Sequence, residues 1–186
     1  GLAARALGDR TAERAGRLTL DPLAHIDPLG FLCMLLLGFG WARPVPVNVS
    51  GFRIKNRKAG MAIVALAGPL SNLVLAFVSY IVALLLAYKV QSDAMFIQTV
   101  QMFFSYIGAL SVGLGVFNLI PVHPLDGSRV LDAFLPYHIQ AKLDRYQPII
   151  LLAVVAIVYF GLFDLVINRV DNWILNLAVR AVFPFL

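Results

Sequence analysis

The chain has 186 residues, of which 60% are hydrophobic, and its mean hydropathy is +0.84. Soluble domains average roughly 45–50% apolar residues with glycine counted, so this composition excludes an ordinary soluble domain and indicates an integral membrane protein. The net charge of +5 does not indicate nucleic-acid binding, because the fifteen basic residues lie mostly between apolar segments, where they set membrane topology. We expect residues 1–186 to form one membrane-embedded domain.

The first stretch, residues 1–7, consists of strong helix formers without an N-terminal cap, and Gly8 follows as a typical helix terminator. It is therefore expected to be the last two turns of a helix whose beginning precedes the chain, and the alternative is a frayed tail. Residues 9–27 are polar and contain two Asp-Pro turn signals, as expected for a connecting segment at a membrane surface.

Residues 29–42 are apolar, but a spanning helix needs roughly 20 residues. Basic residues flank this segment on both sides, so it is predicted to enter the membrane and return to the same side. Cys33, the single cysteine, lies within this segment. One cysteine excludes an internal disulfide, and the Cys33 side chain is expected to be a small buried hydrophobic group. Residues 43–48 then alternate proline and valine, which favours an extended edge-type strand.

Three later segments are long enough to span a membrane, and they predict an all-α polytopic bundle. Gly68-Pro-Leu-Ser-Asn72 is expected to kink the first of them, and the side chain of Asn72 is alternatively a packing contact to a neighbouring helix. Pro136 divides residues 128–147 into two short amphipathic pieces on the cytoplasmic side. The predicted spans are 59–88, 94–120 and 146–163, and an amphipathic tail, 173–186, is expected along the outer interface.

Asp126 is unusual because the run from Ala94 to Leu125 contains no Asp, Glu, Lys or Arg. An ionised side chain in hydrocarbon costs on the order of 2.5 kcal/mol or more, so such a group is usually kept for a partner such as a metal ion. Pro121, Pro124 and Gly127 indicate that the chain unwinds around it. The alternative is a helix that ends at the water interface and leaves Asp126 solvated.

The other polar candidates near breaks in apolar segments are Asn72, Asn118, His25 and His123. One acid and scattered histidines do not form a metal signature, because a hydrolytic zinc site generally has three protein ligands and a water. The histidines are more simply interpreted as solvated loop residues than as ligands.

Four stretches, taken together and in order, resemble elements of one family. Residues 118–127 read Asn-Leu-Ile-Pro-Val-His-Pro-Leu-Asp-Gly, which resembles the Asn-x-x-Pro-x-x-Pro-Leu-Asp-Gly element of the site-2 protease family of zinc intramembrane metalloproteases. Residues 68–72 resemble that family's Gly-Pro-x-x-Asn element. Residues 8–28 and 40–48 resemble the stretches that in many bacterial members follow the metal-binding helix.

The resemblance implies an intramembrane zinc metalloendopeptidase that cleaves transmembrane or membrane-adjacent segments of other proteins. It implies that Asp126 is the third Zn²⁺ ligand and that Asn72 lies near the scissile peptide, where its amide stabilises a developing oxyanion. The family's other two ligands and its catalytic glutamate belong to a His-Glu-x-x-His helix, which this sequence does not contain. We therefore expect the chain to be an N-terminally truncated fragment.

Two other classes of function fit the sequence. One is a non-catalytic membrane scaffold related to these proteases, and the other is an ion or proton pathway that uses Asp126. In each case the expected setting is the cell membrane, with several spans and with the Asp126 loop on the cytoplasmic side. The expected partners are the lipid bilayer and a membrane-protein substrate, and no nucleic acid.

Overall fold

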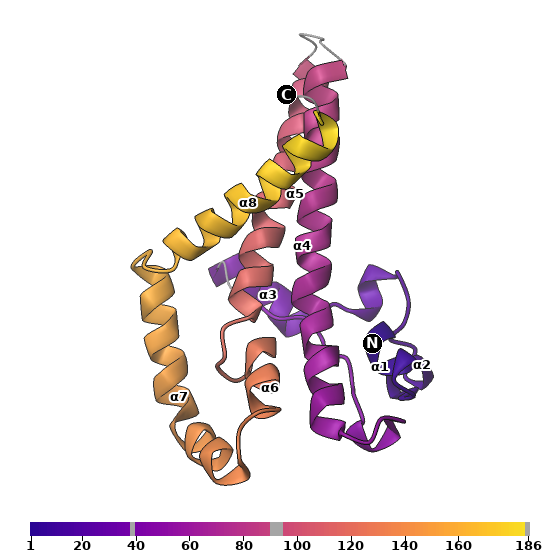
Figure 1. Ribbon diagram of the computed structural model, residues 1–186, viewed down its shortest axis with the longest axis vertical. Helices are drawn as coiled ribbons and strands as arrows, with labels where there is room; N and C mark the ends of the chain where they lie inside the picture. Colours follow the sequence, from indigo (N-terminus) through magenta and orange to yellow (C-terminus); the bar gives the residue numbers. More distant parts are fainter. Residues whose placement is uncertain (38–39, 90–94, 185–186) are drawn as a thin grey trace. The chain divides into compact units, whose positions relative to one another are not determined.

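The computed structural model describes residues 1–37, 40–89 and 95–184, and it is 74% helical, with no β-strand in these ranges. The predicted all-α class is confirmed. The chain divides into two compact units, residues 1–64 and 65–186, and each is described by itself. The helices (Figure 1) are α1 Leu2–Ala6, α2 Thr11–Arg14, η1 Pro22–Ala24, α3 Pro28–Leu37, η2 Val49–Gly51, α4 Arg57–Lys89, α5 Met95–Asn118, α6 Asp126–Asp132, α7 Tyr137–Tyr159 and α8 Asp164–Val182.

A buried carboxylate organises the start of the first unit. Helix α1 ends at Ala6, and Gly8, which was predicted to terminate it, follows two residues later with a φ of 108°, a conformation that glycine adopts readily. The next residue, Asp9, is only 3% exposed, and its carboxylate accepts hydrogen bonds from the backbone N–H of Thr11 at 2.9 Å and of Asn48 at 2.7 Å. Asp9 thereby starts α2 and ties it to the distant segment at Asn48.

A buried arginine replaces the strand predicted for residues 43–48, and that prediction was wrong. The Arg17 guanidinium is withdrawn from water and donates to the carbonyls of Ala24, Arg43 and Pro44, with distances of 2.5 Å to Arg43 and 3.4 Å to Pro44. The alternating prolines lack the N–H groups that a strand ladder needs, so the segment is held through its carbonyl oxygens instead.

The two ends of the segment around α3 lie side by side, which agrees with the return predicted for residues 29–42. The predicted entry of this segment into the membrane stays a prediction. The backbone N–H of Arg43 donates to the carbonyl of His25 at 2.9 Å, and Ile26 forms a bridge with Ala42. The two arms approach so closely that a Cβ at Gly30 would lie 2.1 Å from the Trp41 carbonyl oxygen. The tip at residues 38–39 lies outside the described residues. Cys33 is half-buried rather than fully buried.

In the second unit, α4 and α5 are long and apolar enough to cross a membrane, and α7 with α8 makes a third crossing if this pair, bent by 66°, is one span. The predicted spans 59–88 and 94–120 are thus confirmed by length and composition. Helix α4 continues through Pro69 without ending. The third predicted span, 146–163, is not one helix: α7 covers its first part, begins already at Tyr137 after Pro136, contains Pro148 and ends at Tyr159, before the bend to α8. The predicted loop at 89–93 lies almost wholly outside the described residues.

The core of the second unit joins α4, α5 and α8. Its buried residues are Ala76, Tyr80, Val112, Val116, Ile174 and Ala178. The Tyr80 ring lies against α5 at Gly108, where a Cβ would lie 2.5 Å from the ring, and its hydroxyl donates to the Asp171 carboxylate. Helix α8 crosses α4 and α5 obliquely (Figure 1). It begins at Asp164 and is longer than the predicted tail, whose interfacial placement stays a prediction.

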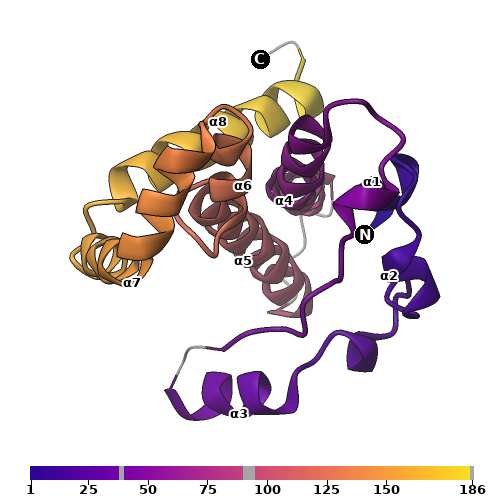
Figure 2. The same ribbon diagram turned by 90° about the horizontal axis from the view of Figure 1, so that it is seen from below.

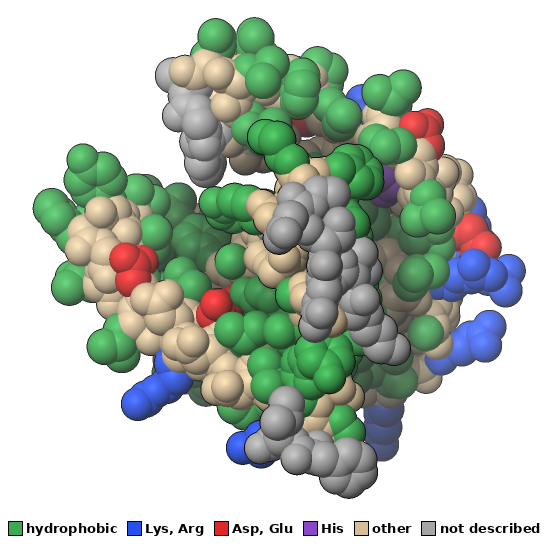
Figure 3. Space-filling model, turned by 90° about the horizontal axis from the view of Figure 1, so that it is seen from above, with side chains coloured by type: hydrophobic (Ala, Val, Ile, Leu, Met, Phe, Trp, Pro, Cys, Tyr) green, Lys and Arg blue, Asp and Glu red, His purple; other side chains and the backbone are tan. Residues whose placement is uncertain are grey.

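The outward surfaces of the two long helices are apolar. Figure 3 shows hydrophobic side chains over much of one face of the molecule. Large exposed side chains on α4 and α5 include Leu70, Val74, Val78, Phe103, Tyr106 and Leu110. Contiguous exposed apolar surface of this kind suits a lipid environment.

We predict that Asp9→Ala loosens the first unit. Burial alone would raise the pKa of Asp9, but hydrogen bonds from Thr11 and Asn48 and the charge of Arg14 together hold this pKa below 3.8. A hydrogen bond to a charged group contributes about 1.5–3 kcal/mol, so the Asn48 amide should exchange its hydrogen at least about tenfold faster in the variant, measured by hydrogen-exchange mass spectrometry.

The stability that the Asp9 carboxylate contributes to the first unit depends on pH. Because the folded pKa is lower than the unfolded one, the stabilisation is fully present above pH 3.8 and is lost as pH falls through the lowered folded value. Asp21→Ala is the matched control, since Asp21 is exposed and its carboxylate accepts a local bond from Leu23. Equal exchange at Asn48 in wild type and Asp9→Ala would contradict the role of Asp9.

Candidate functional site

The turn between α5 and α6 is where the apolar helix gives way to irregular backbone. Helix α5 ends at Asn118, and the following residues contain Pro121 and Pro124, which have no N–H to donate. The unwinding predicted here is confirmed, but it stops earlier than expected, at Leu125. Asp126 is the first residue of α6, because a carboxylate in the first turn is favoured by the positive end of the helix dipole.

Glycine is required at position 127 because α6 passes close to the backbone at the end of α5, and not because the φ angle of Gly127 is unusual. The expectation that Gly127 permits a turn was wrong, since it lies inside α6 and is not among the described glycines with positive φ. A Cβ at this position would lie 2.2 Å from the Leu119 carbonyl oxygen. Only glycine therefore lets α6 fold back against the end of α5.

Asp126 lies directly against α4. A Cβ at Gly68 would lie 3.0 Å from Asp126 Oδ2, so the carboxylate occupies the space that a larger residue would fill. A Cβ at Gly115 of α5 would lie 3.2 Å from the Pro69 carbonyl oxygen and 3.4 Å from Asn72 Cβ. Figure 2 views the molecule from the end at which α6 lies. The structure thus brings the 68–72 and 118–127 segments, which the sequence singled out separately, to one place.

The carboxylate is only half-buried, yet its surroundings favour the neutral form. Burial raises the pKa of Asp126 above its usual value, and the positive charge of Arg129 offsets part of this rise. A cation placed beside Asp126 would reverse that balance, because it favours the ionised form.

The remaining candidates do not join Asp126. Asn118 donates its side-chain N–H to the Leu114 carbonyl at 2.9 Å, within its own helix. His25 belongs to the first unit, where its Nε2 lies 2.9 Å from the Thr19 carbonyl oxygen. His123 pairs instead with Asp132 at 3.2 Å. Sequence reasoning missed that pairing, since neither the spacing nor the residue types of His123 and Asp132 indicate a contact.

The described ranges contain no group of three or more His, Cys, Asp or Glu side chains placed to hold a metal ion. A zinc ion held by protein in a hydrolytic site takes three such ligands. These residues therefore do not make a complete zinc site, and what they offer is one carboxylate, Asp126, beside the amide-bearing turn of α4 that contains Asn72.

Residues 86–161 match Peptidase family M50. The chain is 44% identical over 141 residues to "Putative zinc metalloprotease YwhC" of Bacillus subtilis (strain 168), covering 75% of this chain and 64% of that protein. It is 32% identical over 133 residues to "Putative zinc metalloprotease Rip2" of Mycolicibacterium smegmatis, covering 69% and 48%. It is 34% identical over 103 residues to "Putative zinc metalloprotease MJ0611" of Methanocaldococcus jannaschii, covering 55% and 49%.

The chain therefore spans from about half to just under two thirds of the length of these relatives. No solved structure gives a significant match to it.

We predict that Gly127→Ala strains the turn. The added Cβ would meet the Leu119 carbonyl, which is backbone and cannot rotate away, so the variant should lose about 1–3 kcal/mol of stability, measured by thermal unfolding in detergent micelles. Gly113→Ala on α5 is the control, because its Cβ would meet nothing within 4 Å and alanine favours the helix. A Gly127→Ala variant as stable as Gly113→Ala would contradict the close approach.

Proposed function

Because this chain belongs to peptidase family M50, the site-2 protease family, we propose that the whole protein is a membrane-embedded zinc endopeptidase. Its substrates are transmembrane or membrane-adjacent segments of other proteins. The observation that supports this most directly is the Asp126 carboxylate, held against Gly68 of α4 at the point where an apolar helix unwinds.

The metal is proposed from the relatives, each of which carries "zinc metalloprotease" in its name. Asp126 is proposed as one of its ligands. When bound in a hydrolytic site, zinc lowers the pKa of a coordinated water to about 7. No group of three or more His, Cys, Asp or Glu side chains is placed to hold a metal ion among the described residues, and we propose that the remaining ligands and the general base come from outside them.

The residues of this chain prepare the site in two ways. Gly68 and Gly115 let α4, α5 and α6 approach closely, which fixes Asp126 next to the turn that carries Asn72. We assign Asn72 the role of donating its amide N–H to the oxygen of the substrate carbonyl as negative charge develops there. Donors that are already in place before reaction stabilise such charge without reorganisation.

The membrane setting is proposed from the helices and the charges. Two helices, or three with the bent pair, are long and apolar enough to span, and four basic residues gather just before and at the start of α4: Arg53, Lys55, Arg57 and Lys58. Basic residues accumulate on the cytoplasmic side of spanning helices, which supports a cell-membrane protein with the start of α4 in the cytoplasm.

We predict that Asp126→Asn in the full-length protein lowers zinc retention and abolishes cleavage, while the fold is kept. The amide has nearly the same shape as the carboxylate but no charge, so it is a poor zinc ligand. Zinc content by elemental analysis and cleavage of a transmembrane reporter are the measurements. Asp164→Asn, an exposed acid at the start of α8, is the control.

An Asp126→Asn variant that keeps full zinc occupancy and activity would overturn the assignment of Asp126. A wild-type protein that retains zinc but cleaves no reporter would instead favour the non-catalytic scaffold.

Asn72→Ala is expected to act differently, because Asn72 is proposed to contact substrate and not metal. Zinc content should stay at the wild-type level, and kcat should fall by about 10²–10³, the usual cost of removing one oxyanion donor. Asn168→Ala, on the exposed surface of α8, is the matched control. A fall in zinc content together with kcat would show that Asn72 supports the site structurally and is not a substrate donor.

A further inference from the structure

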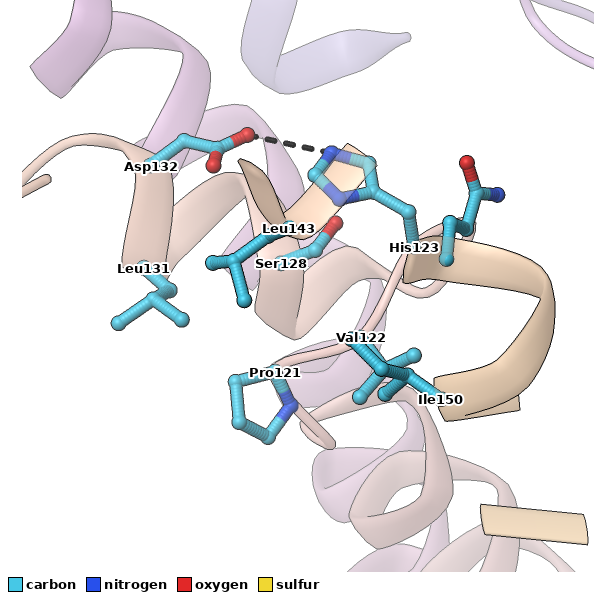
Figure 4. A pocket seen from close by; sticks show the side chains of 9 residues that line it. Pro121, Val122, His123, Ser128, Leu131, Asp132, Leu143 and Ile150 are labelled. Carbon is cyan, nitrogen blue, oxygen red and sulfur yellow. Dashed lines mark ion pairs between the residues drawn. The ribbon is translucent and has the colours of Figure 1, made fainter. Parts of the chain in front are cut away.

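His123 lies between two carboxylates from different helices. Its Nε2 is 3.2 Å from Oδ2 of Asp132, the last residue of α6, and its Nδ1 is 3.7 Å from Oδ1 of Asp144 on α7. Figure 4 shows the ring turned toward Asp132 beside Ser128 and Leu143. One side chain of the turn that precedes Asp126 thus reaches both neighbouring helices.

Backbone hydrogen bonds connect the turn only to residues close to it in the sequence. Pro121 and Pro124 cannot donate hydrogen bonds. The bonds recorded within the turn are short-range, from Val122 to Ile120 and from Leu125 to Val122, each 2.8 Å. Ser128 of α6 adds two bonds to the last residue of the turn, from its backbone N–H at 3.1 Å and from its hydroxyl at 2.7 Å to the Leu125 carbonyl, and none of these bonds reaches α7.

The two contacts of His123 differ in distance and exposure. The side chains of His123 and Asp132 are 19% and 22% exposed, whereas Asp144 is 59% exposed and its contact is longer. Exposed pairs contribute little, so Asp132 is the principal partner and Asp144 the weaker one. The carbonyl of Asp132 also accepts a hydrogen bond from Gln140 Nε2 at 2.7 Å, which links this end of α6 to α7.

The arrangement is neither a metal site nor a substrate pocket. The two carboxylates face opposite nitrogens of one ring, so they do not converge on a common point, and no metal-binding group is found in the described part of the chain. The cavity beside His123 measures about 70 Å³ and is lined by side chains that include Ser128, Asp132 and Gln147. This volume has room for only a few waters, whereas ligand pockets measure about 300–1,000 Å³.

We propose that His123 is a positioning residue: it clamps the 119–125 turn to α6 through Asp132 and to α7 through Asp144, and so keeps the Asp126 carboxylate against Gly68. This inference rests on the proposed function of Asp126. His123 acts through the turn and contacts neither substrate nor metal.

The test uses the full-length protein and three readouts: affinity for Zn²⁺ alone, cleavage of a transmembrane reporter, and hydrogen exchange of residues 119–127. His123→Ala should weaken zinc binding and cleavage by about tenfold, the lower end of what loss of an outer supporting contact costs, and should speed exchange in the turn. His138→Ala on α7 is the control, since His138 is exposed.

Two further variants distinguish loss of the contact between His123 and Asp132 from a general loss of folding. His123→Gln keeps a donor where Nε2 lies and should recover most of the zinc affinity. Asp132→Ala should weaken zinc binding as His123→Ala does, and the double variant should lose little more than either single variant, because both remove the same contact.

The clamp is overturned if His123→Ala binds zinc and exchanges like His138→Ala, or if the losses from His123→Ala and Asp132→Ala add in full. It is also overturned if His123→Gln recovers nothing. If wild-type protein binds no zinc, the proposed function fails, and hydrogen exchange alone decides the clamp: faster exchange of residues 119–127 in His123→Ala supports it, and unchanged exchange rejects it.

Discussion

The candidate site depends on the absence of a side chain at Gly68. A carboxylate can rest against the surface of a long apolar helix only where that surface is open, and a Cβ at Gly68 would come within 3.0 Å of Asp126 Oδ2. The same device recurs at Gly115, which admits the Pro69 carbonyl, and at Gly127, which admits the Leu119 carbonyl. The missing side chains at these three glycines therefore let α4, α5 and α6 lie close together around the half-buried acid. This close approach also explains why the acid lies so near the Asn72 turn.

Side chains add links in two proline-containing stretches, where the prolines have no N–H to donate. In the first unit, Arg17 donates to the carbonyls of residues 43 and 44 in the proline-rich segment, and the Asp9 carboxylate accepts from the N–H of Asn48. In the second unit, His123 reaches from the proline-containing turn to two helices. Irregular backbone near a membrane needs partners for its polar groups, and in this chain charged side chains provide several of them.

Much of the fold could be predicted from the sequence, because hydrophobic length is a strong signal. The spans containing α4 and α5, the returning segment at α3, the helix end before Gly8 and the unwinding after Asn118 all follow from local patterns. The strand at 43–48 was predicted wrongly, because the alternation of proline and valine does not indicate that the Arg17 side chain donates to the carbonyls of Arg43 and Pro44. The role of Gly127 and the contact of His123 with Asp132 depend on how separate elements meet, and no local pattern encodes that meeting. Asp126 and Asn72 were both identified from sequence, and the resemblance placed them at one site; the close approach of Asp126 to Gly68 became apparent only in three dimensions.

The narrow gap at Gly68 also bears on which acid the position accepts. Aspartate and glutamate carry the same charge, but glutamate is longer by one methylene, and the carboxylate of Asp126 already lies close to α4 at Gly68. A longer acid would have to turn away from α4 or push the two helices apart. The length of the side chain at position 126 therefore matters for the contact with α4 as well as its charge.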